Sequence, residues 1–324
     1  MRVMVLGGTG FVGRHAAAAL RARGHTVVIG TRDPKRALRK LPPALRASLH
    51  DVELREIHFE SLTTRYVWKP LLADVDAVVN AAGILRERGG ETYDRVHNMA
   101  PSALALACER LGLRLVHVSM LGLRREARSR FLRSKLLAER AIAATAADYC
   151  IVRPSLLDGE GGFGADWMRR VARMPVHFFP ANAAGRIAAL DARDLGEAIA
   201  TLCEVPGDSV PRQVELGGSA RRTLADYLRA LRAARDERPA LQIPVPAPLV
   251  RLAGALCDLF HLTPVSGGLL ELVRRDNLPA QNLLQALIGR APTPVGQDLP
   301  ARRRSYAFAA MPTGHETPVP PSPQ

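Results

Sequence analysis

A glycine-rich turn at the start of the chain constrains the fold more than any other feature. The apolar run 3–6 leads directly into the turn Gly7-Gly8-Thr9-Gly10-Phe11-Val12-Gly13, and residues 14–23 then read as a helix. In such a turn Gly7 allows a sharp bend, Gly10 lets backbone N–H groups approach a pyrophosphate, and Gly13 permits close helix packing. The phosphates would lie at the positive end of the helix. An ordinary tight turn explains this spacing poorly, so the sequence predicts a dinucleotide site.

The rest of the first half alternates strands with helices. The pattern predicts further strands at 26–29, 52–57, 77–80, 115–118 and 149–152, with a short helix from Pro34 and longer helices at 92–111 and 129–144. Six strands joined by helical crossovers indicate an α/β fold of the Rossmann type, with a doubly wound parallel sheet. We therefore expect a dinucleotide-binding domain over residues 1–154.

The second half is less regular. Residues 155–310 are expected to form a smaller C-terminal cap region that carries the substrate site and returns some elements to the sheet. They include a flexible loop at 159–164, a strand at 213–216, a helix at 223–234 and a Pro-rich linker at 239–248. Residues 311–324 contain five prolines and almost no apolar side chains, which predicts a disordered tail.

Composition indicates a soluble protein. At 324 residues and 47% apolar content the chain can build one large or two modest cores. Its four cysteines form no CxxC pair, so neither a metal site nor a disulfide framework is predicted. No secretory signal precedes the first strand, and no apolar run reaches the ~20 residues of a membrane span. We expect a cytoplasmic protein, with a peripheral position on the inner membrane as the alternative.

The formal net charge of +14 would ordinarily suggest a polyanionic partner. Only four of the 45 basic residues are lysines, however, and the arginines are dispersed along the chain. We interpret this as the codon bias of a GC-rich genome, and no nucleic-acid motif accompanies it. No nucleic-acid partner is expected, since an anionic cofactor or a membrane surface explains the charge equally well.

The end of the second predicted strand indicates which cofactor binds. NAD-binding folds usually place a carboxylate there, but this chain has Thr31-Arg32. We interpret Asp33 as the cap of the turn that begins at Pro34. Arg32 is then left facing the ribose, where a guanidinium would pair with a 2′-phosphate, and Arg14 would add a second contact. The sequence predicts NADP(H), with NAD(H) as second choice; the alternative is a solvated Arg32.

Small residues at the ends of later strands complete the expected crevice. Ligands of parallel sheets lie at the carboxyl ends of the strands, and residues 58–60 would there flank the adenine. The predicted cofactor-binding residues are those of the glycine turn and the strand ends: Gly7, Thr9, Gly10, Phe11, Val12, Gly13, Arg14, Arg32, Ala81, Ala82, Gly83 and Pro154.

At these residues the sequence resembles an atypical or extended short-chain dehydrogenase/reductase. The likeness is carried by the glycine turn, the strand end Asn80-Ala81-Ala82-Gly83, Ser119, and the step Arg153-Pro154-Ser155. More narrowly, the segments 116–119, 132–135, 214–218, 275–277 and 292–294 resemble bacterial relatives of the nucleotide-binding accessory subunit of respiratory complex I. The resemblance runs from residue 1 to about residue 300.

The resemblance implies a catalytic serine, tyrosine and lysine, with the lysine four residues after the tyrosine. The tyrosine exchanges a proton with the substrate, the lysine lowers the tyrosine pKa and holds the nicotinamide ribose, and the serine polarises the carbonyl. Ser119 and Lys135 fit this set, but Phe131 occupies the tyrosine position. A phenyl ring donates no proton, so the resemblance implies a degenerate site in which Lys135 still binds the cofactor.

Several structural interpretations stay open beside these. Ser119 could be a small residue at a crowded strand end, and Lys135 a solvated helix lysine. Tyr93 and Tyr149 could replace the missing acid, although each is better explained as structural. Asn98 could orient Lys135 or form a hydrogen bond along its own helix.

Three functions are compatible with this pattern. The first is an NADP(H)-binding protein with a structural, sensing or respiratory and quinone-associated role. The second is an active NADP(H)-dependent reductase, epimerase or dehydratase that uses another proton donor on a small molecule or quinone. The third is a regulator of the nitrogen-metabolism type that reads the NADP redox state. Apolar residues at helical spacing over 248–262 either pack on their own domain or dock on a membrane surface or protein partner.

Overall fold

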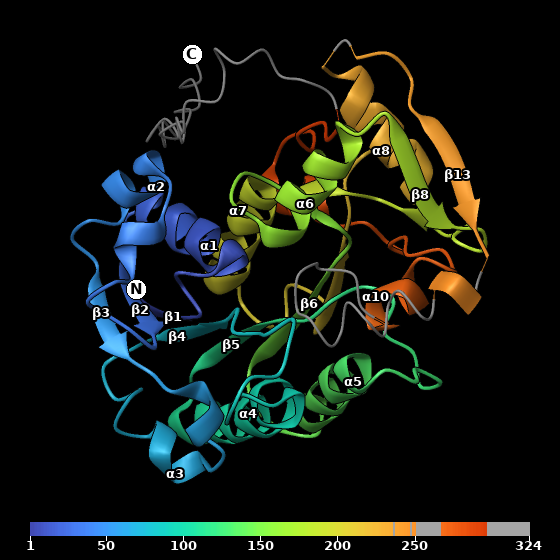
Figure 1. Cartoon of the computed structure of the whole chain (residues 1–324). Helices are drawn as coiled ribbons and strands as arrows, with labels where there is room; N and C mark the ends of the chain where they lie inside the picture. Colours follow the sequence, from blue (N-terminus) through green and yellow to red (C-terminus); the bar gives the residue numbers. More distant parts are fainter. Residues whose placement is uncertain (236, 247, 251–266, 297–324) are drawn as a thin grey trace, which may run out of the picture.

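A seven-stranded parallel sheet forms the centre of the computed structural model, which describes residues 1–235, 237–246, 248–250 and 267–296 (Figure 1). The strand order is β11-β6-β5-β4-β1-β2-β3, and every pairing is parallel. The strands are β1 (Arg2–Leu6), β2 (Thr26–Thr31), β3 (Glu53–Glu56), β4 (Ala77–Asn80), β5 (Arg114–Val118), β6 (Tyr149–Pro154) and β11 (Gln213–Leu216). The predicted Rossmann-type doubly wound sheet is confirmed.

Helices cover both faces of this sheet (Figure 1). Side chains alternate along each strand, so Val3 and Val5 pack into one buried cluster while Met4 and Leu6 pack into the other. The first cluster lies under α1 (Phe11–Ala22), α2 (Pro43–Ser48), α7 (Ala192–Glu204) and α11 (Leu284–Ile288). The second lies under η2 (Phe59–Ser61), α3 (Arg65–Trp68), α4 (Ala100–Leu111) and α5 (Arg130–Ala143). Burial on both faces explains why central strands such as β1 and β4 read as continuous apolar runs.

Part of the chain after β6 returns to the sheet as β11, α7 and α11, and the rest forms a smaller group of elements beside it (Figure 1). Helices α6 (Phe163–Ala172) and α8 (Leu224–Ala233) share a cluster that includes Met168 and Tyr227. Strand β8 (Val176–Pro180) pairs with β13 (Leu241–Val245). Two short pairs join β7 (Leu157–Asp158) to β10 (Leu190–Asp191), and β9 (Arg186–Ile187) to β12 (Arg222–Thr223). A further helix, α10, spans Gly267–Leu272.

Three predicted elements differ from the structure. The helix expected from Pro34 is a series of turns leading to the 3-10 helix η1 (Leu38–Lys40), and the Asp33 carboxylate caps the first turn by accepting from the Arg36 N–H at 3.2 Å. The helix expected at 92–111 starts with a π-helical turn, η3 (Arg95–Met99), which continues into α4. The linker expected at 239–248 contains β13, because β8 supplies it with hydrogen-bonding partners.

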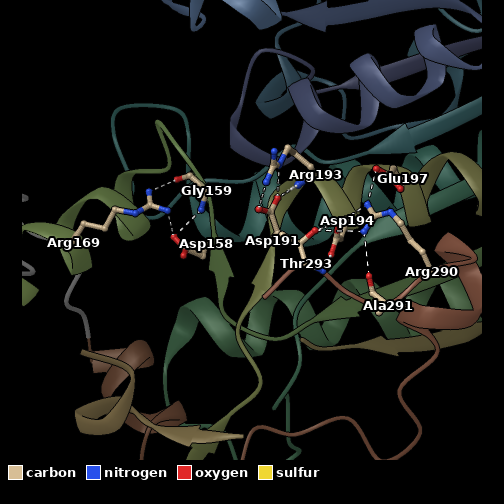
Figure 2. Close-up of polar contacts among 10 residues, drawn as sticks. All are labelled: Asp158, Gly159, Arg169, Asp191, Arg193, Asp194, Glu197, Arg290, Ala291 and Thr293. Atoms are coloured by element: carbon tan, nitrogen blue, oxygen red, sulfur yellow. Dashed lines mark hydrogen bonds and ion pairs between the residues drawn. The ribbon is translucent and has the colours of Figure 1, made fainter. Parts of the chain in front are cut away.

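A buried carboxylate holds the last described segment on α7. Asp194 has no exposed surface, and its oxygens accept hydrogen bonds from the Arg290 guanidinium and from the N–H and hydroxyl of Thr293 (Figure 2). Asp191 is the N-cap of the same helix, and its carboxylate accepts a hydrogen bond from the Arg193 N–H at 2.7 Å (Figure 2). No helix within the described ranges is both long and apolar enough to cross a bilayer. The predicted docking segment 248–262 lies outside the described residues from 251 onward, as does the whole predicted tail, 311–324.

Candidate functional site

The glycine turn has the conformation that a phosphate cradle requires. Gly7 has a φ of +69°, in the left-handed region, and turns the chain away from β1. A β-carbon on Gly13 would lie 2.2 Å from the Gly7 carbonyl oxygen, so only glycine allows α1 to approach the turn this closely. Helix α1 begins at Phe11 and has no acidic residue in its first turn. Its first N–H groups therefore point at a place that favours an anion.

A cavity of about 340 Å³ opens at this helix terminus. It lies at the carboxyl ends of β1, β2 and β4, where the topology predicts a ligand. Among the residues predicted to bind a cofactor, Gly7, Thr9, Gly10, Arg32, Ala81, Ala82 and Gly83 line it, and so does Phe59 from the segment expected to flank the adenine. Arg36 and Glu91 also line the cavity, and the sequence reasoning missed both. Arg36 could have been found as a basic residue one turn after Arg32; Glu91 carries no local signal.

Arg14 is placed differently from the prediction. Its side chain is 5% exposed, stacks over the Phe11 ring at 5.2 Å, and donates to the backbone carbonyl of Glu160. It does not line the cavity with Arg32. The physical reason is that the loop after β7 folds against α1 and offers Arg14 a backbone acceptor. The side chain of Phe11 faces the same loop, near Gly159 and Gly162, and Val12 packs on the core; neither residue lines the cavity.

Further along the sheet edge, a buried hydroxyl lacks a partner. Ser119 follows β5 and is 6% exposed, and no described residue hydrogen-bonds its Oγ. Pro154 ends the neighbouring strand β6, is buried, and accepts from the Leu121 N–H at 2.9 Å. An unsatisfied buried hydroxyl costs free energy unless a ligand or water pairs with it. Ser119 therefore fits a position that contacts a bound molecule.

Lys135 lies among neutral histidines. Burial lowers the Lys135 pKa from 10.5 to about 8, with Glu139 partly opposing the shift. Burial and the charge of Lys135 also lower the pKa of His117 to about 3 and that of His97 well below its ordinary value. The Asn80 amide donates to His117 Nδ1 at 3.0 Å, which leaves the proton of this neutral ring on Nε2.

The π-helical turn carries His97 into this cluster. The Ile84 N–H donates to His97 Nε2 at 3.0 Å, so the ring proton is on Nδ1 and faces the Ser134 hydroxyl at 3.4 Å. Asn98, the alternative considered for orienting Lys135, instead donates to Asp94 at 2.8 Å along its own helix. His97, and not Asn98, is thus the residue of the π-helical turn that belongs to the cluster around Lys135, and such turns are frequent at functional sites.

Phe131 meets Tyr93 and His97 at the wall of a second, larger cavity. Its ring centroid lies 5.5 Å from that of Tyr93 and 5.4 Å from that of His97, and the Lys135 ammonium is 5.9 Å from the Phe131 centroid. Both Tyr93 and Phe131 line this cavity of about 1070 Å³, and the Tyr93 hydroxyl donates to the Leu85 carbonyl at 2.8 Å. Tyr149, by contrast, is a buried residue of β6. Only Tyr93, of the two tyrosines considered from the sequence, reaches a cavity.

Replacing Lys135 with methionine should stabilise the chain at pH 7 and weaken cofactor binding roughly tenfold, because a charged hydrogen bond to a ribose is lost. The Lys135 pKa is about 8 in the folded chain and 10.5 ordinarily. Between these two pH values Lys135 therefore keeps its proton in the unfolded chain and loses it in the folded chain. The contribution of Lys135 to stability therefore rises with pH through this window and is lowest below pH 8. Thermal unfolding of both proteins at pH 7 and pH 10 measures this: the gain of Lys135→Met should shrink at pH 10. A variant less stable than the parent at pH 7 would contradict it.

These features together fit a nicotinamide dinucleotide. The glycine turn and the terminus of α1 would hold the diphosphate, the cavity at β2 the adenosine, and Lys135 with Ser119 the nicotinamide end. Three independent observations agree with this fit: a cradle that a β-carbon would fill at Gly13, the orphaned Ser119 hydroxyl, and the Arg32 and Arg36 guanidiniums in the cavity next to β2.

Comparison with known proteins gives the same answer. The model of a family described as NAD(P)H-binding matches residues 7–170. A ceramide reductase of Caulobacter vibrioides is 30% identical over 79% of this chain and 77% of its own. A mitochondrial NADH dehydrogenase [ubiquinone] 1 alpha subcomplex subunit 9 of Dictyostelium discoideum is 26% identical over 74% of this chain and 66% of its own.

The fold recurs in solved structures. A nucleoside-diphosphate-sugar epimerase of Staphylococcus aureus superposes with a TM-score of 0.68 over 92% of this chain and 99% of its own, at 17% identity. The resemblance to short-chain dehydrogenase/reductase proteins and to the complex I accessory subunit, drawn from the sequence, is confirmed. The chain belongs to the NAD(P)H-binding family, with the short-chain dehydrogenase/reductase-like fold and a nicotinamide dinucleotide as the family's ligand.

Proposed function

We propose that the chain binds NADP(H) in preference to NAD(H). The observation that carries this is the pair of guanidiniums, Arg32 and Arg36, at the end of the 340 Å³ cavity next to β2. Strand β2 itself ends without the carboxylate that usually binds the ribose hydroxyls of NAD. Guanidinium groups form charge-assisted and often bidentate hydrogen bonds with phosphate, so this end of the cavity suits an adenosine 2′-phosphate.

Arg32→Ala should weaken NADPH binding about ten- to hundredfold and leave NADH binding within a factor of about two, since a charge-assisted hydrogen bond contributes about 1.5–3 kcal/mol. Titration of both reduced cofactors by fluorescence or calorimetry checks this. Arg39→Ala is the matched control, because Arg39 is exposed and does not line the cavity. Equal losses for both cofactors, or tighter NADH than NADPH binding by the parent chain, would refute the proposal.

The role that we propose for this binding is structural, sensing, or respiratory and quinone-associated. Phe131 occupies the helix position of the family's proton donor, four residues before Lys135, and offers no proton. Cofactor binding needs only the glycine turn, Arg32 and Lys135, so it does not depend on the missing proton donor. The relationship to a subunit of NADH dehydrogenase supports such a role, because that relative is named as part of a respiratory assembly. Cofactor that co-purifies and stays unoxidised with carbonyl and quinone compounds would favour it.

An active reductase is the second candidate, and one observation favours it. Tyr93 packs edge-on against Phe131 and lines the same large cavity, so it places a phenol next to the position where the family's tyrosine would be. The relationship to a ceramide reductase supports this alternative. In such a reaction a bound NADPH would be the source of the hydride that reduces the carbonyl carbon. Tyr93 would give its proton to the carbonyl oxygen, and Ser119 would hold that oxygen.

A peripheral membrane or protein partner through residues 248–262 stays part of this proposal. The relationship to a respiratory subunit supports it, while residues 251–262 lie outside the described part of the chain.

A further inference from the structure

The cavity at β2 contains a carboxylate that comes from a distant part of the chain. Glu91 lines the cavity and forms an ion pair with the guanidinium of Arg32. The Glu91 side chain is 23% exposed and that of Arg32 is 60% exposed, so the carboxylate is the more buried partner. The pair spans the opening between β2 and the loop that follows β4.

A tight hairpin fixes Glu91 in this place. Arg88 and Glu91 exchange two backbone hydrogen bonds, of 3.1 and 3.0 Å, and Gly89 turns between them with a φ of +53°. The hairpin belongs to the segment that also carries Glu87 and Tyr93. The backbone that carries the Glu91 carboxylate is thus fixed by the two hydrogen bonds of this turn.

The charges at this end of the cavity are balanced before any ligand binds. Arg32 pairs with Glu91, while Asp33 accepts from the Arg36 N–H and lies 3.8 Å from the Arg36 guanidinium. A 2′-phosphate brings about −1.5 to −2 charges near neutral pH and would approach the guanidinium that Glu91 already occupies. The phosphate must either displace the Glu91 carboxylate from Arg32 or bind beside it despite the repulsion between the two negative charges. An adenosine 2′-hydroxyl brings no charge and can donate to a carboxylate, as in NAD-binding folds.

From this arrangement, and resting on the cofactor site proposed above, we infer that Glu91 is a specificity-determining residue. It opposes NADP(H) by competing for Arg32 and supports NAD(H) by accepting from the ribose hydroxyl. Arg32 and Glu91 therefore act in opposite directions on the same choice. The carboxylate that usually ends β2 has a functional counterpart here, supplied 59 residues later by the hairpin.

The test is a titration of the full chain with NADPH and with NADH, for the parent and for Glu91→Gln. The amide keeps the shape of the side chain but removes its charge. We expect NADPH to bind about tenfold more tightly and NADH about threefold more weakly, so the ratio of the two affinities rises at least tenfold. Glu91→Ala, which removes the side chain, should shift the ratio in the same direction. An unchanged ratio in both variants overturns the inference.

Two controls separate this inference from the proposed function. Glu56→Gln removes an equal charge at the end of β3, where the exposed Glu56 pairs with His58 and does not line the cavity; it should leave the ratio unchanged. An equal shift in Glu56→Gln would mean a general charge effect and would overturn the role of Glu91. Arg32→Ala tests the phosphate site itself. If it weakens NADPH binding while Glu91→Gln changes nothing, the proposed function stands and only the inference fails; if Arg32→Ala has no effect, the proposed function fails.

Discussion

Phe131→Tyr is expected to create or raise NADPH-dependent turnover by ~10²- to 10⁴-fold, the usual contribution of a positioned general acid. Tyrosine at this position would share a helix face with Lys135 four residues later, and the ring at this position already lies 5.9 Å from the Lys135 ammonium. Phe131 lines the large cavity, so an added hydroxyl has open space beside it. The measurement is the steady consumption of NADPH with a panel of carbonyl and quinone substrates.

The matched control is Phe131→Leu, which changes the packing but adds no proton donor. Equal rates for the tyrosine and leucine variants across the panel would contradict a silenced site. Tyr93→Phe separates the two proposed functions, because it should abolish any turnover of the parent chain if Tyr93 is the donor and change nothing if the parent only binds cofactor. A parent chain that turns over at the same rate with and without the Tyr93 hydroxyl would exclude Tyr93 as the proton donor.

Asp194→Ala is expected to lower the free energy of unfolding by about 2–4 kcal/mol, because a fully buried carboxylate and the hydrogen bonds that it accepts are lost, while its partner Arg290 is partly exposed. Asp194 has no exposed surface and accepts at 2.8 Å from Arg290 and at 2.6 and 2.8 Å from the N–H and hydroxyl of Thr293 (Figure 2). Its loss removes the acceptor of the Thr293 N–H and hydroxyl, while Arg290 keeps Glu197 of α7 as a partner at 2.8 Å. Urea denaturation followed by circular dichroism measures the change.

Asp276→Ala is the control for this prediction. Asp276 forms an ion pair with Arg186 at the surface, where both side chains are about half exposed, so its removal should change stability little. A similar loss in the two variants would mean that burial of Asp194 is not the cause. These contacts also give a physical meaning to the late sequence segments 275–277 and 292–294: Thr293 bonds to Asp194 of α7, and Asp276 pairs with Arg186 of β9.

Local sequence was sufficient for the features that depend on neighbouring residues. The bend at Gly7 and the close packing at Gly13 follow from residues within one turn, and both are as predicted. The cap formed by Asp33 is another such feature. The strands were readable because burial on both faces demands continuous apolar runs, which a single sequence displays directly.

Features that depend on contacts between distant segments of the chain could not be predicted from the sequence. The segment 239–248 looks like a linker because of its prolines, yet it forms β13 because β8 offers it partners. Arg14 follows the glycine turn as a phosphate ligand would, but the Glu160 carbonyl binds it elsewhere. The π-helical turn at η3 gives no signal in the pattern of the long helix, although it decides that His97 and not Asn98 approaches Lys135.

The sequence by itself determined that this chain folds as a doubly wound sheet and holds a dinucleotide. The reason is that the pattern of burial and the geometry of the glycine turn both depend on residues that are close together in the sequence. Only the tertiary structure decided what surrounds the bound groups. Glu91 reaches Arg32, and Tyr93 reaches Phe131, across 59 and 38 positions of the chain. The physical reason is that side-chain charge and proton donors act over a few ångströms in space, a distance that the order of the residues does not encode.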